Sequence, residues 1–217
     1  MKLPSIQCLT ADGLALSHAE QVRAFCQAGA KMIQLRMKQA DAQEVVRVVR
    51  DCLPACRQAD CLLIVNDHLE AALESGADGV HLGKNDLPWE AAREQSSSGF
   101  LIGGTVNSLV DAKRASACAV LDYAGVGPYR FTHTKACLAD VLKREDWQSI
   151  VHELGVLPSF AIGGIGLGDL ASVSALGVHG VAVCSSVVCD EPTLLIKNYR
   201  SLATGWETEK GLNRCQV

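Results

Sequence analysis

The sequence predicts a single (β/α)8 TIM barrel, and three observations lead to this fold class. Eight short apolar runs alternate with eight amphipathic stretches along the 217 residues. Barrels of this kind routinely form one domain of about 200–250 residues. A doubly wound open sheet also alternates strands with helices, but no G-x-G-x-x-G motif follows the first apolar run. We therefore expect one catalytic barrel domain over residues 1–203, followed by a polar, poorly ordered tail over residues 204–217.

The eight expected strands are rich in β-branched residues and leucine, and most of them are nearly continuous apolar runs. Such runs are typical of parallel strands that are buried on both faces. The strands are expected at Ser5–Leu9, Met32–Leu35, Leu62–Asn66, Gly79–Leu82, Leu101–Gly103, Tyr123–Val126, Ser159–Ile162 and Gly180–Val183.

The expected helices lie between these strands and carry apolar residues at helical spacing, with charged residues between them. Several end at a glycine just before the next strand, as expected where the last turn needs left-handed backbone. The helices are expected at His18–Ala28, Asp41–Gln58, Leu69–Ser75, Trp89–Gln95, Leu109–Ala119, Glu145–Leu154, Gly168–Leu176 and Pro192–Leu202.

Composition excludes several classes of protein. The chain has 20 basic and 24 acidic residues, a net charge of −4, which gives no support for a nucleic-acid partner. No apolar run approaches the roughly 18–20 residues of a membrane span, and the N-terminus lacks a signal-peptide pattern. We expect a cytoplasmic protein with no membrane partner. The 10 cysteines form no C-x-x-C motif, so they are expected to be reduced, mostly buried thiols.

Polar residues gather where barrel strands end, which is where barrel enzymes carry their working groups. After the second expected strand, alternation directs Gln34, Arg36 and Lys38 to one face. Two cations and an amide at the barrel mouth indicate an anion site, since Arg matches phosphate oxygens and Lys supplies a point charge.

Two aspartates follow the next two strands, Asp67 directly after Asn66 and Asp86 shortly after Leu82. Each aspartate could instead cap the helix that follows it. Beside the basic residues of the second strand, however, a shared Mg²⁺ is favoured, because Mg²⁺ takes one or two carboxylates and completes its shell with water and phosphate.

Further candidates follow the fifth to eighth strands. Thr105 can hydrogen-bond a phosphate oxygen, and the long loop over residues 127–140 carries threonines and a lysine. Gly163-Gly164 and Ser185-Ser186 end the last two strands, where barrels often bind a phosphate monoester. The sequence thus predicts two anion sites. His81 is interpreted as a core residue that faces the barrel interior.

These segments, in this order, resemble the thiamin phosphate synthase (thiamine-phosphate pyrophosphorylase) family. Each alone is weakly specific, but the N-D, H-L-G-x-x-D and T-x-T-K segments in series are specific, and the likeness spans about residues 5 to 200. The matching blocks are Gln34-Leu35-Arg36-Met37-Lys38, Val65-Asn66-Asp67, Ala77–Gly83 with Asp86, Asp122-Tyr123 with Gly125–Pro128, Thr132-His133-Thr134-Lys135 and Ile162–Ile165.

The resemblance implies a Mg²⁺-dependent transferase that joins a hydroxymethylpyrimidine diphosphate to a thiazole phosphate and releases thiamin phosphate and pyrophosphate. It implies catalytic roles for Arg36, Lys38 and Lys135 and Mg²⁺ ligation by Asp67 and Asp86. The implied pyrimidine diphosphate contacts are Gln34, Leu35, Arg36, Met37, Lys38, Asn66, Thr105 and Lys135. The implied thiazole phosphate contacts are Thr132, His133, Thr134, Gly164, Cys184 and Ser185.

Two alternatives stay open at this point. A thiazole tautomerase shares the barrel and several blocks, but it should not need the paired aspartates or the T-x-T-K cation. A non-catalytic thiamin-pathway binding protein would be expected to have lost Asp67, Asp86 or Lys135, and all three are present. The resemblance also suggests a homodimer. The chain departs from the family at Thr105, where serine is more usual, and at Cys184, which replaces isoleucine or valine.

Overall fold

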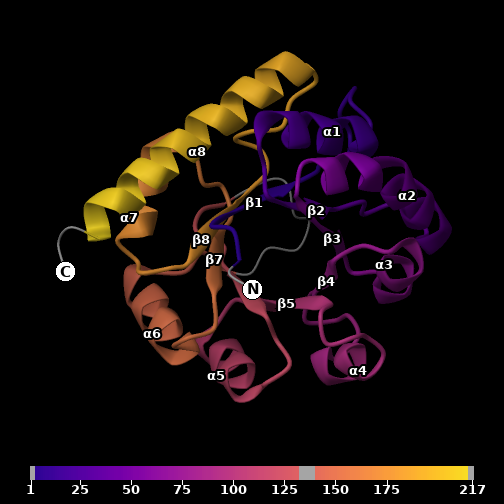
Figure 1. Ribbon diagram of the computed structural model, residues 1–217. Coiled ribbons are helices and arrows are strands. Elements are labelled where there is room, and N and C mark those ends of the chain that lie inside the picture. Colours follow the sequence, from indigo (N-terminus) through magenta and orange to yellow (C-terminus); the bar gives the residue numbers. More distant parts are fainter. Residues whose placement is uncertain (1–2, 132–139, 215–217) are drawn as a thin grey trace.

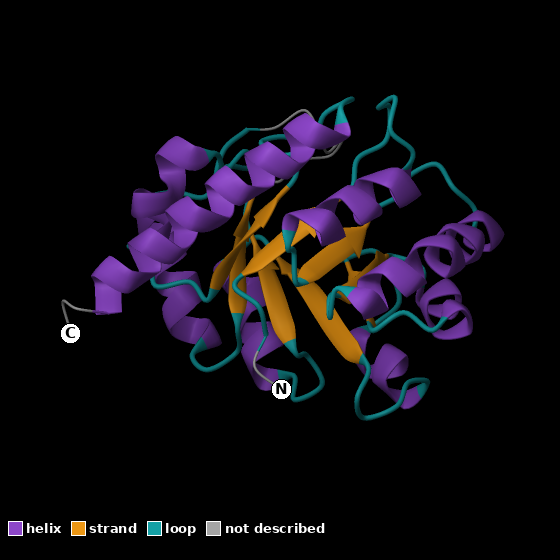
Figure 2. Ribbon diagram, turned by 45° about the horizontal axis from the view of Figure 1, so that its top comes forward, coloured by secondary structure: helices purple, strands orange, loops and turns teal. Residues whose placement is uncertain are grey.

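The computed structural model describes residues 3–131 and 140–214, and its core is a closed barrel of eight parallel strands (Figure 1). The strands follow one another around the barrel in chain order, and β1 pairs with β8 to close it. Figures 1 and 2 show the helices on the outside of the strands. The predicted (β/α)8 fold class is confirmed.

The strands lie where the apolar runs predicted them, with one difference of more than a residue. Their bounds are β1 (Ile6–Leu9), β2 (Met32–Leu35), β3 (Leu62–Asn66), β4 (Gly79–Leu82), β5 (Leu101–Val106), β6 (Tyr123–Val126), β7 (Ser159–Ile162) and β8 (Gly180–Val183). β5 runs three residues beyond its expected end at Gly103, because Gly104, Thr105 and Val106 also pair in register with β6.

The helices also follow the expected order. Their bounds are α1 (His18–Ala28), α2 (Ala42–Gln58), α3 (Leu69–Ser75), α4 (Trp89–Glu94), α5 (Leu109–Ala117), α6 (Arg144–Leu154), the 3₁₀ turn η1 (Leu167–Asp169), α7 (Leu170–Ser174) and α8 (Pro192–Arg214). A capping box between Ser17 and Glu20 begins α1, and Gly29 at φ 97° ends it. The helix expected over residues 168–176 is a 3₁₀ turn followed by a short α-helix.

The poorly ordered tail expected from residue 204 is wrong as far as residue 214, since these residues continue α8. The reason is one apolar anchor, Trp206, whose side chain is fully buried in the core. Lys210 lies over the Trp206 ring, 5.1 Å from its centroid, and donates a hydrogen bond to the Val178 carbonyl.

Among the described residues, no helix combines the length and apolar character that crossing a membrane requires.

Two apolar layers hold the barrel together. The outer layer packs the helices against the strands, and the inner layer fills the barrel with side chains that include Met32, Tyr123 and Phe160. The Tyr123 and Phe160 rings meet edge to face, with centroids 5.5 Å apart. The described cysteines are all free thiols, as expected, and several belong to the outer layer.

Gly103 tests how tightly the inner layer is packed. A Cβ at this position would overlap the Tyr123 ring. Gly103→Ala is therefore expected to destabilise the protein by about 1–3 kcal/mol, because overpacking forces a buried ring out of place. Denaturant unfolding measures this, with Gly99→Ala as the matched control, since no atom lies within 4 Å of its added methyl. Equal losses for both variants would contradict the packing.

Candidate active site

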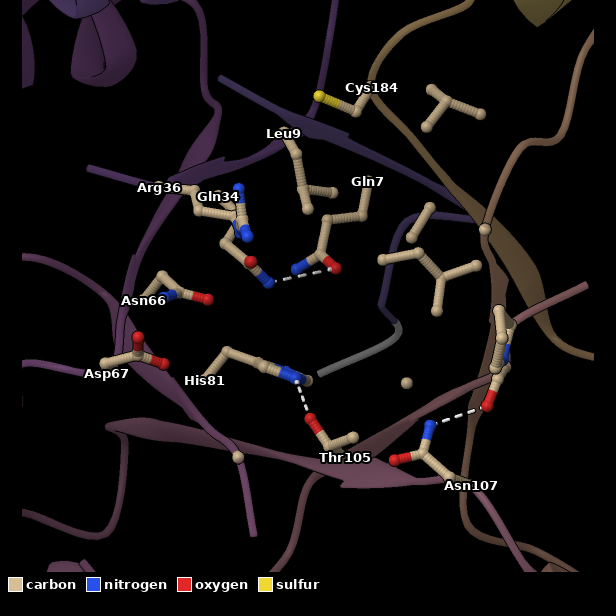
Figure 3. Close-up of a pocket in the computed structure, with 18 of the residues that line it drawn as sticks. Gln7, Leu9, Gln34, Arg36, Asn66, Asp67, His81, Thr105, Asn107 and Cys184 are labelled. Carbon is tan, nitrogen blue, oxygen red and sulfur yellow. Dashed lines mark hydrogen bonds between the residues drawn. The ribbon is translucent and has the colours of Figure 1, made fainter. Parts of the chain in front are cut away.

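A cavity of about 340 Å³ opens at the C-terminal end of the barrel (Figure 3). All eight strands or the loops that follow them contribute to its lining. This placement follows from the topology, because the carboxyl ends of all the parallel strands meet at one edge of the barrel.

The end of β2 supplies alternate side chains to the cavity. Gln34, Arg36 and Lys38 line it, as alternation predicted. Leu35 and Met37 instead lie in the outer apolar layer, so only their backbone could reach a ligand. Of the residues predicted around the diphosphate, Asn66 and Thr105 also line the cavity.

Arg36 is a nearly buried cation, with 8% of its surface exposed. Of the cations that line the described part of the cavity, Lys38 pairs with Asp67 and Lys84 pairs with Asp111. No described carboxylate lies within 4 Å of the Arg36 guanidinium. A buried charge is costly without a partner, so Arg36 favours an anionic ligand in this cavity.

Asp67 occupies strained backbone at the end of β3. Its φ of 68° lies in the left-handed region, which few residues other than glycine adopt. Its carboxylate accepts a hydrogen bond from Lys38 Nζ at 2.8 Å. Burial raises the pKa of Asp67, but the bond and charge of Lys38 outweigh it, so the pKa lies below its ordinary value.

Asp86 lies beside Asp67 and has the opposite shift. Its carboxylate accepts a hydrogen bond from the Gly83 N–H at 2.6 Å. Burial and the neighbouring Asp67 carboxyl raise the pKa of Asp86 above its ordinary value. Neither aspartate caps a helix, because the N-cap residues of α3 and α4 are His68 and Pro88. The structure thus excludes the capping alternative.

The two aspartates fit a Mg²⁺ ion by their chemistry. Their carboxyl groups interact directly, and bringing two like charges together favours a shared cation. Hard carboxylate oxygens are the ligands Mg²⁺ prefers, and one or two suffice when phosphate completes the shell. Within the described residues, no group of three or more His, Cys, Asp or Glu side chains could hold a metal. A site of two carboxylates and a ligand phosphate is therefore what this cavity could provide.

Because the pKa values of Asp67 and Asp86 are shifted in opposite directions, replacing each residue by Asn should have opposite effects on stability at pH 7. Folding raises the pKa of Asp86, so its negative charge destabilises the folded protein when the pH is above the raised pKa. Below the ordinary pKa of an aspartate, about 4, the carboxyl is protonated in both states and this cost disappears. Asp86→Asn should raise the melting temperature by roughly 1–3 °C at pH 7, and this gain should vanish as the pH falls towards about 4.

Asp67→Asn serves as the matched comparison. The pKa of Asp67 is lowered in the folded protein, so its ionised carboxylate stabilises the fold at any pH above the ordinary pKa. This stabilisation is lost as the pH falls through the lowered pKa. This variant should melt below wild type at pH 7. Thermal unfolding of both variants between pH 4 and 7 without added metal gives the measurement, and shifts of equal sign would contradict the assignment.

The floor of the cavity is polar, and some of its residues were not predicted as part of the site. His81 lines it, and its Nε2 lies 3.1 Å from Thr105 Oγ1 (Figure 3). Its Nδ1 lies 3.3 Å from the Tyr123 hydroxyl. Gln7 donates to the Tyr123 hydroxyl at 3.1 Å and accepts from Gln34 at 3.5 Å. The interpretation of His81 as a core residue facing the interior is right about its direction but overlooked its exposure to the cavity.

Asn107 is a second residue that lines the cavity without having been predicted to do so. Ser108 caps α5, which leaves Asn107 free to line the cavity. Its side-chain amide donates to the Gly127 carbonyl at 2.5 Å and so joins β5 to the loop after β6. Inward alternation along an extended β5 is the signal that would have identified it.

The loops after β7 and β8 form the opposite side of the cavity. Gly163 and Gly164 have φ values of 110° and 64°, which L side chains rarely adopt, and both line the cavity with Cys184 and Ser185. Burial raises the pKa of the Cys184 thiol to about 11, so it is a poor nucleophile at neutral pH. The predicted contacts Thr132, His133, Thr134 and Lys135 lie outside the described residues.

Comparison with known proteins agrees with this geometry. Residues 7–187 match the sequence profile of the TMP-TENI family, described as thiamine monophosphate synthase. A thiamine-phosphate synthase of Bacteroides fragilis is 40% identical over 188 residues, covering 85% of this chain and 92% of the relative. One of Methanospirillum hungatei is 41% identical over 176 residues, covering 80% and 83%.

Among solved structures, the thiamine phosphate pyrophosphorylase of Pyrococcus furiosus is similar to this chain with a TM-score of 0.82 and 32% identity. The match covers 94% of this chain and 96% of that structure. A 3-hexulose-6-phosphate synthase, 14% identical with a TM-score of 0.65, shares the fold alone. The chain belongs to the thiamine monophosphate synthase family, as its motifs predicted.

Proposed function

We propose that this protein is a Mg²⁺-dependent thiamine-phosphate synthase. It joins a hydroxymethylpyrimidine diphosphate to a thiazole phosphate and releases thiamin phosphate and pyrophosphate. The family supports the class of reaction. The observation that carries the substrate assignment is Arg36, a nearly buried cation with no carboxylate partner among the described residues, in the same cavity as two adjoining aspartates.

The diphosphate binds at the ends of β2 and β3 in this proposal. Arg36 supplies a planar fork matched to phosphate oxygens, and Lys38 supplies a second charge. Lys38 already touches Asp67, so it lies where the diphosphate and the metal would meet. Lys135, through the family's T-x-T-K motif, would add a third cation.

Asp67 and Asp86 would hold the Mg²⁺ ion. When bound, the ion would supply positive charge against the negative charge that develops on the leaving pyrophosphate. Arg36 and Lys38 neutralise the same charge without needing to move a proton, which is electrostatic catalysis by fixed groups.

The proposed reaction breaks the bond between the methylene carbon and the diphosphate oxygen, and the electron pair leaves with pyrophosphate. The electron-rich aminopyrimidine stabilises the resulting carbocation, and the lone pair of the thiazole nitrogen then forms the new C–N bond. No protein nucleophile is required. The raised pKa of the Cys184 thiol agrees with this, because that thiol stays protonated at neutral pH.

The thiazole phosphate, which is the second substrate, has its own anion site in this proposal. We assign the thiazole phosphate to the loops after β7 and β8, where Gly164, Cys184 and Ser185 line the cavity. Glycine at φ 64° lets backbone N–H groups approach a phosphate closely. Thr132, His133 and Thr134 would complete this site, as the family motif implies.

Incubating the protein with both phosphorylated substrates and Mg²⁺ tests the proposal. Equal amounts of pyrophosphate and thiamin phosphate should form, and chelation of Mg²⁺ should abolish both. Isomerisation of a thiazole without pyrophosphate release would indicate a tautomerase. Binding of both substrates in calorimetry without any turnover would indicate a non-catalytic binding protein.

A further inference from the structure

The segment from Arg36 to Lys38, directly after β2, is held by hydrogen bonds to side chains and not by backbone hydrogen bonds between strands. β2 ends at Leu35, and the last backbone bond from β1 to this strand runs from the Thr10 N–H to the Gln34 carbonyl at 3.1 Å. Beyond this point the Arg36 N–H donates to Thr10 Oγ1 at 3.0 Å, and the Lys38 N–H donates to Asp12 Oδ2 at 3.2 Å. Two side chains of the β1–α1 loop therefore take the place of a strand partner.

His18 joins these two side chains. Its Nδ1 lies 2.8 Å from Thr10 Oγ1, and its Nε2 lies 3.0 Å from Asp12 Oδ1. Because an ionised Asp12 can only accept, Nε2 carries a hydrogen and donates. In a neutral ring Nδ1 then accepts from the Thr10 hydroxyl, whose oxygen keeps a lone pair for the Arg36 N–H.

The clamp formed by Thr10, Asp12 and His18 is itself anchored. Thr10 is fully buried, and His18 is the first residue of α1, directly after the N-cap Ser17. At the other end of the loop, the Ala15 N–H donates to Asp190 Oδ1 at 2.7 Å. None of the three clamp residues belongs to the lining of the cavity.

We propose that Thr10, Asp12 and His18 are positioning residues that set the direction of the Arg36 and Lys38 side chains. This inference rests on the proposed function, in which those two cations bind the diphosphate. Because the backbone N–H groups of Arg36 and Lys38 are both held, the backbone at each of these alternate residues has little freedom to redirect its side chain. A clamp of this kind lowers the entropic cost of binding an anion.

Pyrophosphate binding in the presence of MgCl₂, measured by calorimetry, tests the clamp independently of turnover. His18→Ala is expected to weaken pyrophosphate binding about tenfold and to raise the KM for the pyrimidine diphosphate similarly. The KM for the thiazole phosphate should stay within about twofold of wild type. His18→Gln should restore much of the loss, because its amide can donate to Asp12 and accept from Thr10.

Matched variants separate positioning from folding. Thr10→Val removes the hydroxyl but keeps the shape, whereas Thr10→Ser keeps the hydroxyl, so only the valine variant should bind pyrophosphate weakly. His152→Ala, an exposed change on α6, is the control. A purely structural role would lower the melting temperature without changing the affinity of the folded protein.

Wild-type pyrophosphate affinity in both His18→Ala and Thr10→Val would overturn the clamp. If wild-type protein binds pyrophosphate with Mg²⁺ but makes no thiamin phosphate, the proposed function fails. The affinities of the variants still decide for or against the clamp in that case.

Discussion

Replacing Asp67 by Asn is expected to lower turnover by about 10²–10³-fold while the barrel stays folded. The substitution removes the negative charge that would hold Mg²⁺ and also removes the ion pair with Lys38. Asn adopts left-handed backbone at least as readily as Asp, so the φ of 68° need not change. Steady-state kinetics at saturating Mg²⁺ would give the loss, with circular dichroism to confirm the fold.

The control for this variant is Asp51→Asn. Asp51 is an exposed residue that pairs with Arg23 on the outside of the barrel. Its loss should leave turnover unchanged, since exposed pairs contribute little and this one is far from the cavity. Turnover close to wild type in Asp67→Asn would remove Asp67 from the proposed metal site.

The second large effect is expected from Arg36→Ala, which should lower kcat/KM for the pyrimidine diphosphate by about 10²–10³-fold. The guanidinium is nearly buried and has no described carboxylate partner, so the fold does not depend on its charge. The melting temperature should therefore hold or rise, because an unpaired buried charge costs stability. Steady-state kinetics and thermal unfolding of the same preparation would test both the loss of kcat/KM and the unchanged or raised melting temperature.

Arg36→Lys and Arg47→Ala complete this comparison. The lysine variant keeps the charge but loses the planar fork, so it should recover only part of the activity. Arg47 is an exposed residue of α2 outside the cavity, and its loss should change neither quantity. A marked fall in stability for Arg36→Ala would mean that the fold uses this charge, against our interpretation.

Most of the fold could be predicted because strands buried on both faces are read from short apolar runs. The bounds of β2, β3, β4, β6, β7 and β8 match the runs residue for residue. β5 was expected to end at Gly103, three residues too early. The Tyr123 and Trp89 side chains that lie against Gly103 and Gly104 explain why these strand positions carry no Cβ atoms. The extension of α8 depends on Trp206, a single buried anchor in a polar stretch that shows no clear periodicity.

The site could be predicted in part because polar side chains at strand ends must meet at one edge of the barrel. Arg36, Asp67 and Asp86, which follow three different strands, could be identified in this way. His81 and Asn107 could not, because an inward polar residue gives the same sequence pattern whether it packs in the core or faces the cavity. The roles of Leu35 and Met37 came from matching a whole block, and the structure directs their side chains away from the cavity.

A crystal structure with Mg²⁺ and inorganic pyrophosphate would test the central claim most directly, namely that one cavity binds a metal diphosphate between Arg36 and the two aspartates. The predicted result is one ion that contacts both Asp67 and Asp86, with pyrophosphate against Arg36 and Lys38. Pyrophosphate bound elsewhere, or an ion that contacts neither aspartate, would contradict the account.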